Sequence, residues 1–202
     1  MEVITRNYEV YEFDELDDEA QERAIQDNFD INVFDDWYEF RFDEWEDQLE
    51  DMGFEEVEIS FTGFWSQGDG ASFTAKSIDV EKYIRNQRLG QEYRPLLAIL
   101  KQDWSIDGQV VRDKYLQYVH EYTTSVELET DFHDNENPQR EGKVIAQMND
   151  LGEYIQDHVV QLNLAIYYDL SKDYDYLTSR ESIADAFKSN NYRFLEDGEI
   201  FY

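Results

Sequence analysis

The chain contains few side chains of the kinds that perform catalysis or bind metals. Its 202 residues include no cysteine and three histidines, His120, His133 and His158, which are far apart and lack the spacing of metal ligands. The segment around His133, Asp134 and Glu136 lacks the regularly spaced carboxylates of a calcium-binding EF-hand. The sequence contains no phosphate-binding glycine loop, nucleophile elbow or His-Glu-x-x-His motif. We therefore expect a protein that is not an enzyme and that uses no cofactor or metal.

One nearly uncharged stretch, GFWSQGDGASF at residues 63–73, is the candidate small-ligand loop. Its candidate ligand contacts are Trp65, Gln67 and Asp69. The stretch lies between two segments with strand-like alternation, Glu55–Phe61 and Ala71–Lys76, so its glycines would equally serve to turn the chain of a hairpin. Asp69 would also repel a phosphate. We favour the hairpin connection and keep ligand binding as the alternative.

Acidic side chains dominate the composition, and the formal net charge is −31. Residues 1–60 contain 23 acidic and 3 basic side chains, residues 61–120 contain 7 and 8, and residues 121–202 contain 18 and 6. A salt-adapted protein would spread its acidity over all exposed faces, whereas this chain concentrates it. Because the basic surface that binds phosphates is missing, we expect no direct contact with nucleic acid.

The densest acidic segment is a predicted helix from Val33 to Met52, ended by Gly53. Its predicted core stripe contains Phe34, Tyr38, Phe42, Trp45, Leu49 and Met52. Nine carboxylates occur in residues 35–51, roughly one per 3 Å of helix axis, close to the roughly 3.4 Å between phosphates of one DNA strand. The predicted partner-binding residues are Asp35, Asp36, Glu39, Asp43, Glu46, Asp47 and Glu50. A solvated helix face is the alternative, although few basic residues at i,i+4 neutralise these carboxylates.

The remaining patterns predict an α+β fold, with small antiparallel hairpin sheets packed against several helices. We expect a single domain over residues 1–202, with an acidic helical part at about residues 14–52. At the start of the chain, Val3–Phe13 alternates like a strand. Asp14 is the predicted N-cap of a helix. The apolar stripe of this helix would contain Leu16, Ala20, Ala24 and Phe29.

Several further elements are predicted beyond the residue 63–73 loop. Helices are expected at Ile78–Leu89, Tyr93–Gln102, Glu141–Tyr168 and Ser179–Lys188. A strand containing Val126 and Leu128 is expected to pair with Tyr115–Tyr122, and Asp197-Gly198 predicts a closing hairpin. Basic residues in the middle of the chain are candidates to pair with the acidic helices; they are Lys82, Arg85, Arg88, Arg94 and Lys101.

The sequence predicts a protein of a reducing cytoplasm. It contains no apolar run approaching about 18 residues, so no membrane span is expected. Its N-terminus lacks the pattern of a secretory signal. The absence of cysteine fits a reducing compartment.

Three motifs carry a family resemblance. They are Phe13-Asp14-Glu15-Leu16 followed by Glu19-Ala20-Gln21 and Ala24, the stretch ISFTGFWSQGDGASF at residues 59–73, and Tyr192-Arg193-Phe194-x-Glu196-Asp197-Gly198. Together they resemble a family of acidic, mostly uncharacterised proteins of tailed phages and prophages, some of them loosely labelled antitoxins. The resemblance carries over no catalytic residues. It implies a bacterial cytoplasm during phage infection, where small acidic proteins often block host defences.

These observations predict a phage-encoded acidic binding protein of the anti-CRISPR or anti-restriction type. By mimicking the charge of nucleic acid, it would inhibit a basic host protein such as a nuclease, CRISPR effector, restriction enzyme or toxin. One alternative is an antitoxin-like neutraliser of a basic toxin, and another is a small-ligand-binding protein that uses the residue 63–73 loop. A homodimer through the apolar stripe of the long C-terminal helix is a further expectation.

Overall fold

The computed structural model describes residues 6–34, 36–102, 104–112 and 118–201 of the chain. Over these residues the chain forms six α-helices, a four-stranded antiparallel sheet and a two-stranded sheet, which confirms the predicted α+β class. Contacts divide the chain into two compact units. The first unit contains Met1–Glu39 and Ser171–Tyr202, and the second contains Phe40–Leu170. The single domain over residues 1–202 expected from the sequence stays a prediction.

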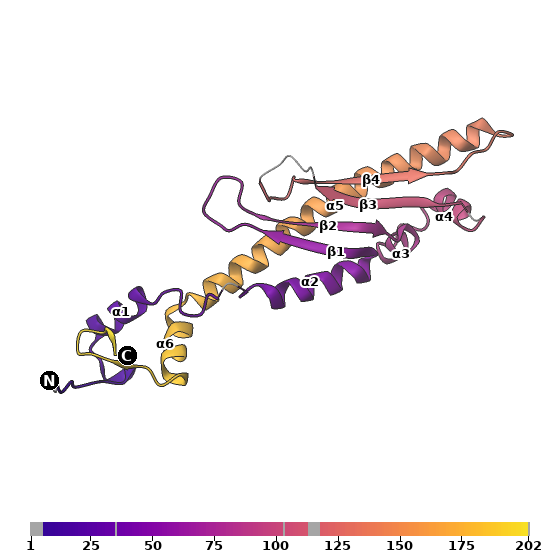
Figure 1. Cartoon of the computed structure of the whole chain (residues 1–202). Helices are drawn as coiled ribbons and strands as arrows, with labels where there is room; N and C mark the ends of the chain where they lie inside the picture. Colours follow the sequence, from indigo (N-terminus) through magenta and orange to yellow (C-terminus); the bar gives the residue numbers. More distant parts are fainter. Residues whose placement is uncertain (1–5, 35, 103, 113–117, 202) are drawn as a thin grey trace, which may run out of the picture. The chain divides into compact units, whose positions relative to one another are not determined.

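The second unit is built on the four-stranded sheet (Figure 1). Its strands are β1 (Phe54–Phe61), β2 (Ala71–Ile78), β3 (Ile106–Arg112) and β4 (Thr124–Thr130). They lie in the order β1-β2-β3-β4, and each neighbouring pair is antiparallel. The hairpin of β1 and β2 confirms the two strands predicted on either side of the residue 63–73 loop.

The pairing predicted for β4 is wrong. β4 pairs with β3, from Ile106 opposite Thr130 to Arg112 opposite Thr124. Of the predicted partner, residues 115–117 lie outside the described part of the chain and residues 118–122 form no strand. β3 was not predicted from the sequence, because Gly108 interrupts its apolar alternation. A Cβ at Gly108 would lie 2.8 Å from Leu128 Cδ2, so close packing against β4 explains the glycine.

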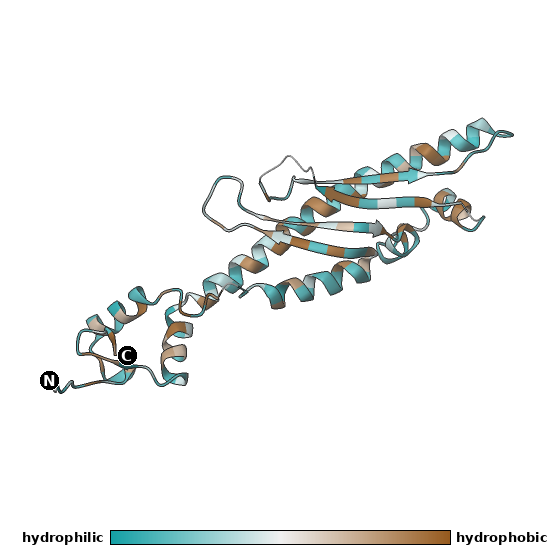
Figure 2. Ribbon diagram, in the orientation of Figure 1, coloured by the Kyte–Doolittle hydropathy of each residue, from teal (hydrophilic) through white to brown (hydrophobic). Residues whose placement is uncertain are grey.

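Hydropathy alternates along strands such as β1 (Figure 2), and burial alternates with it, so the sheet has an apolar face and a polar one. Ile59, Phe73 and Val110 are buried, whereas Glu58 and Gln109 are exposed. Helix α5 (Pro138–Leu177) covers one face of the sheet (Figure 1). Its predicted stripe is buried throughout and consists of Val144, Met148, Leu151, Ile155, Val159, Leu162 and Ile166. The sheet and α5 together form the core of the second unit, as two-layer packing requires.

Two buried tyrosines fasten short helices to α5. Helix α3 (Val80–Asn86) contributes Tyr83, whose hydroxyl lies 2.7 Å from Nδ1 of His158. Tyr93 precedes α4 (Arg94–Leu100) and donates a hydrogen bond of 2.8 Å to Oδ2 of Asp150. Burial is the main cause that raises the pKa of both phenols. Both helices confirm their predictions, although each is shorter than expected.

The first unit brings the two ends of the chain together. Its elements are a 3₁₀ turn (Phe13–Glu15), α1 (Asp18–Asp27), α6 (Arg180–Ser189), β5 (Arg193–Phe194) and β6 (Ile200–Phe201). A core cluster joins residues from both ends, among them Phe13, Ala24, Phe187 and Phe194. Gly198 turns the β5–β6 hairpin with φ +89°, and a Cβ there would lie 2.2 Å from the Ala20 carbonyl. The predicted closing hairpin and the helix after Ser179 are therefore confirmed.

The predictions for the start of the chain need correction. Residues 6–10 form no strand, and only Tyr11 makes an isolated bridge, to Phe194; residues 3–5 of the predicted strand lie outside the described residues. The N-cap of α1 is Asp17, whose carboxylate accepts the Ala20 amide at 2.8 Å, whereas Asp14 lies in the preceding 3₁₀ turn. Phe29 is 46% exposed rather than buried.

Helix α2 (Glu39–Met52) begins six residues later than predicted. Before it, turn-type bonds join the Val33 amide to Asp30 and the Glu39 amide to Asp36. The Asn32 side chain bonds to the Leu177 carbonyl and to Ser182 Oγ, which fixes this segment in a non-helical path within the first unit. Phe34 is therefore outside the helix and 67% exposed, and Tyr38 also precedes the helix. Within the predicted stripe, Trp45 and Leu49 are buried and Phe42 and Met52 are half-buried.

Candidate interaction surfaces

Helix α2 presents a line of carboxylates on the face opposite its buried residues. At 100° per residue, Asp43, Glu46 and Glu50 fall within about 60° of arc, and Asp47 lies next to them. The buried Trp45 and Leu49 lie on the other side of the helix. Asp43, Glu46, Asp47 and Glu50 are named here the acidic stripe, and all but the half-buried Glu46 are exposed.

Burial and the negative charges of neighbouring carboxylates perturb the pKa of one member of the acidic stripe. The pKa of Glu46 is raised, first by burial and then by the negative charges of Asp43, Glu50, Asp47 and Glu58. Arg41, on the same helix, forms an ion pair of 2.7 Å with Glu44, outside the stripe. The stripe therefore concentrates negative potential on one side of α2.

Two of the basic residues predicted to pair with the acidic helices, Lys82 and Arg85, make other contacts. Lys82 donates to the backbone carbonyl of Glu50 at 2.5 Å, and Asn86 donates to the carbonyl of Asp51 at 2.5 Å. Both groups satisfy the carboxyl end of α2, where a cation also complements the helix dipole. Arg85 pairs with Glu81 of its own helix at 2.7 Å. These contacts hold α2 and α3 together and leave the carboxylate oxygens of Glu50 facing outward.

The structure gathers four of the seven predicted partner-binding residues in the acidic stripe. Glu39 is the first residue of α2, and Asp36 lies in the turn before it; both belong to the first unit. Asp35 lies outside the described residues. The continuous acidic surface on α2 is thus narrower than the set of residues predicted from sequence.

The residue 63–73 loop is ordered by its own acidic side chain. Oδ2 of Asp69 accepts hydrogen bonds from the amides of Trp65 (3.1 Å) and Ser66 (2.7 Å). Gly63 (φ +122°) and Gly68 (φ +91°) supply conformations that favour glycine. Phe64 packs against Phe61 and Tyr167. These contacts account for the unusual sequence as a hairpin connection.

The candidate ligand residues of this loop do not converge on a site. Asp69 is engaged by the loop backbone, while Gln67 and Trp65 are exposed, the latter by 76%. A hollow of about 210 Å³ adjoins Asp69 and Asn163. The Asn163 amide is fully engaged: it accepts from the Phe73 amide and donates to the Glu121 carbonyl and Thr124 Oγ1. This asparagine ties α5 to β2 and β4.

The three histidines make local contacts. His158 is bonded to Tyr83, His133 Nδ1 lies 3.2 Å from Glu141, and His120 Nδ1 accepts the Tyr122 amide at 3.2 Å. Across the described residues, no group of three or more His, Asp or Glu side chains is placed to hold a metal ion.

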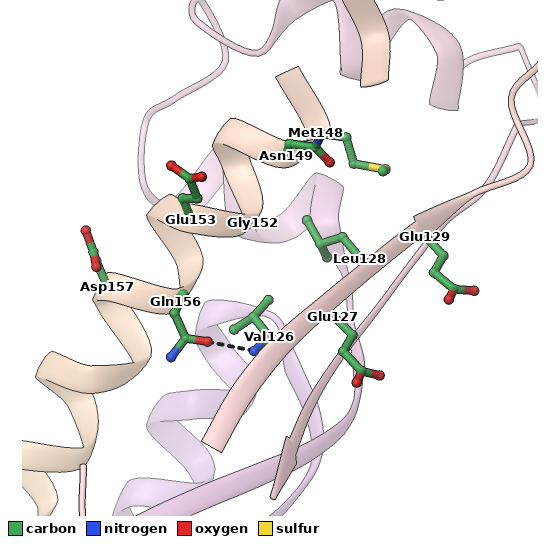
Figure 3. Close-up of a pocket in the computed structure, with 10 residues that line it drawn as sticks. All are labelled: Val126, Glu127, Leu128, Glu129, Met148, Asn149, Gly152, Glu153, Gln156 and Asp157. Carbon is green, nitrogen blue, oxygen red and sulfur yellow. Dashed lines mark hydrogen bonds between the residues drawn. The ribbon is translucent and has the colours of Figure 1, made fainter. Parts of the chain in front are cut away.

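A groove that the sequence did not predict lies between β4 and α5 (Figure 3). The groove has a volume of about 980 Å³, and its lining includes Val126, Leu128, Met148, Gly152 and Gln156. The only signal in the sequence is Gly152, a glycine within a strongly predicted helix. The partner strand cannot be inferred from that signal because it lies far away in the chain.

The fold and these surfaces define an acidic α+β protein whose carboxylates line one helix and one groove. The chain belongs to a family described as a domain of unknown function, DUF8835, whose model matches residues 37–180. This match includes the whole second unit, with the acidic stripe, the residue 63–73 loop and the groove. No curated protein and no solved structure matches the chain. In the described part of the chain, every helix is too short or too polar to cross a membrane.

Proposed function

We propose that this protein is a phage-encoded acidic binding protein of the anti-CRISPR or anti-restriction type. It acts in the bacterial cytoplasm by occupying the basic nucleic-acid-binding surface of a host defence protein. The acidic stripe of α2 is the observation that carries this proposal, since its carboxylates stand close enough together to raise the pKa of Glu46 beyond the effect of burial. The phage origin rests on the resemblance of the three sequence motifs.

The stripe suits a surface that normally binds a phosphate backbone. Its carboxylates recur along a straight helix at a linear density of roughly one per 3 Å, similar to one strand of DNA. Exposed carboxylates raise the rate of encounter with a basic cleft, and salt weakens that attraction. The buried Trp45 and Leu49 hold the other face of α2, so the stripe is displayed on a fixed element rather than on a loop.

The proposal is tested by capture followed by competition. Immobilised protein is incubated with bacterial lysate at low and high salt, and retained proteins are identified by mass spectrometry. A retained basic nuclease, restriction enzyme or CRISPR effector is then titrated with its own nucleic acid in the presence of this protein. We expect capture at low salt, release at high salt and displacement of the nucleic acid.

Matched variants decide whether the stripe is responsible. The variant D43N/E46Q/D47N/E50Q should compete at least about tenfold less well. The control E19Q/E181Q/D185N/E199Q removes the same charge from exposed positions of the first unit and should compete like the unmodified protein. Equal competition by all three proteins would refute the role of α2. Capture of a basic toxin that binds no nucleic acid would instead favour the antitoxin-like alternative.

A further inference from the structure

The outer edge of β4 is a second interaction surface, separate from the acidic stripe. We propose that it binds an extended basic segment of a partner protein, which adds to the sheet as a fifth strand. This inference does not depend on the proposed function of α2. Strand addition draws affinity from backbone hydrogen bonds and specificity from alternate side chains.

The first observation is that β4 presents its backbone to the groove. Among the described residues, β4 is an edge strand that pairs with β3 on its inner side. On its outer side, Gln156 of α5 accepts a hydrogen bond from the Val126 amide at 2.8 Å (Figure 3). The side-chain nitrogen of Gln156 donates to the Thr124 carbonyl at 3.2 Å. Backbone groups of a strand alternate in direction, so Leu128 and Thr130 point their N–H and C=O groups the same way as Val126. At one end of this edge, the side-chain amide of Gln156 thus makes the same two hydrogen bonds that the backbone of an added strand would make.

The second observation is that the groove has room for side chains and an apolar floor. The half-buried Val126 and Leu128 and the buried Met148 contribute the apolar part of its lining. Its volume of about 980 Å³ lies at the upper end of the roughly 300–1,000 Å³ found for ligand pockets. Figure 3 shows these side chains between the ribbon of β4 and that of α5. A strand laid along β4 would insert every second side chain into this space.

The third observation is a glycine that packing does not require. Gly152 lies within α5, where glycine costs about 1 kcal/mol relative to alanine. A Cβ at this position would lie 3.6 Å from Leu128 Cδ1, which is an ordinary van der Waals contact. Alanine therefore fits, whereas a large side chain would enter the groove. The glycine keeps the space beside β4 open.

The fourth observation is the negative charge around the groove, which favours a basic partner segment. On β4, Glu127 and Glu129 point away from α5 (Figure 3), and Gln109 donates a hydrogen bond of 2.7 Å to Glu127. On α5, Glu153 and Asp157 adjoin the groove, and all four carboxylates are exposed. Edge-to-edge pairing with a second copy would bring Glu127 and Glu129 against their own counterparts, and like charges on paired strands are destabilising. A segment that alternates apolar with lysine or arginine side chains matches both features. Its apolar side chains contact the apolar lining of the groove, and its cations lie near the carboxylates.

The probe for this surface is an acetylated, fluorescein-labelled peptide of alternating lysine and valine. Two further forms are methylated on the backbone nitrogens of either the valines or the lysines. An antiparallel fifth strand directs the valine N–H groups to β4, and a parallel one directs the lysine N–H groups. We expect one methylated form to bind at least about tenfold more weakly in fluorescence anisotropy and the other to bind like the parent. Equal affinity of all three peptides would overturn the proposal.

Variants of the protein locate the peptide. Gly152→Phe should weaken binding at least about tenfold by filling the groove, while Gly152→Ala should bind as the unmodified protein does. The variant E127Q/E129Q/E153Q/D157N should also bind more weakly, and D43N/E46Q/D47N/E50Q, which removes equal charge from α2, should not. Equal losses for the two quadruple variants would mean attraction to net charge alone and would refute the site. Dimerisation in sedimentation that Gly152→Phe abolishes would also refute it, in favour of a second copy.

Discussion

Acidic side chains are used differently in the first unit and on helix α2 of the second unit. In the first unit, cations join the two ends of the chain through carboxylates distant in sequence: Arg180 contacts Glu22 at 2.7 Å and Lys188 contacts Asp14 at 2.8 Å. In the second unit, α2 carries its acidic stripe outward, and the nearby Lys82 binds a backbone carbonyl instead. Local composition therefore does not decide whether an acidic residue stabilises the fold or faces a partner. The role of an acidic residue is decided by where cations lie in the folded chain.

The two units are also stabilised by different contacts. The ion pairs of the first unit are about half exposed, and such pairs typically contribute about 0–1 kcal/mol each. Its stability must come mainly from the aromatic cluster around Phe187, whose ring lies 5.3 Å from Phe13 and 5.0 Å from Phe194. The second unit relies on the α5 stripe and on the buried amide of Asn163.

The largest expected effect comes from the core of the first unit. Phe187→Ala should lower the free energy of unfolding by about 3–5 kcal/mol, because it leaves a cavity among packed rings. Hydrogen exchange should show lost protection in α1 and α6. The exposed Phe34→Ala is the control and should have little effect. If the amides of β1–β4 lose protection to the same extent, the two units unfold together as the single domain predicted from the sequence. The two units would then not differ in their free energies of unfolding.

A somewhat smaller loss is expected from Asn163→Ala in the second unit. The substitution strips hydrogen bonds from the Phe73 amide, the Glu121 carbonyl and Thr124 Oγ1 in a buried site. We expect a loss of about 2–4 kcal/mol in urea unfolding. Asn149→Ala, at an exposed position of the same helix, should not destabilise. If Asn163→Ala left the urea concentration at the unfolding midpoint unchanged, water would be able to replace these hydrogen bonds.

The pH dependence of stability due to His158 should differ in sign from that due to Glu46 of the acidic stripe. Burial lowers the pKa of His158 below its ordinary 6.5. Its neutral form is favoured in the folded state, so the stability it contributes is present above pH 6.5 and is lost as pH falls through the lowered pKa. His158→Gln should flatten the fall of stability in this range. The exposed His133→Gln is the control; equal flattening by both variants would exclude burial as the cause.

Glu46 should show the opposite behaviour. Its raised pKa means that the protonated form suits the folded state, so its favourable contribution is present below pH 4.5 and is lost as pH rises through the raised pKa. Glu46→Gln should therefore be more stable than the unmodified protein at pH 7, with the advantage vanishing on acidification. Thermal unfolding across this range, at low and high salt, measures the difference. A constant advantage at every pH would contradict the ionisation of Glu46 as its origin.

The smallest expected effect belongs to the ion pairs of the first unit. Removing Arg180 by substitution with alanine should cost about 0.2–1 kcal/mol, since the pair with Glu22 is half exposed and screened by salt. A double-mutant cycle with Glu22→Ala isolates the pair from other contacts of each side chain. A coupling energy well above this range would mean that ion pairs, and not the aromatic cluster, hold the two ends together.

The amino-acid sequence by itself determined the elements whose signals are local. The 3.6-residue spacing of Val144 to Ile166 specified the buried stripe of α5, and glycines at positions 63, 68 and 198 marked the two hairpin turns. The acidic stripe was also visible in advance, because neighbours on a helix face are close in sequence.

Only the tertiary structure decided the features that depend on residues far apart in the chain. The start of α2 depends on Asn32 bonding to Leu177 and Ser182, β3 is recognisable only once Gly108 packs under Leu128, and the β4 edge is defined by Gln156. Which carboxylates face cations likewise depends on partners such as Arg180 that are distant in sequence. These contacts form only when the chain closes on itself, so no periodicity along the sequence records them.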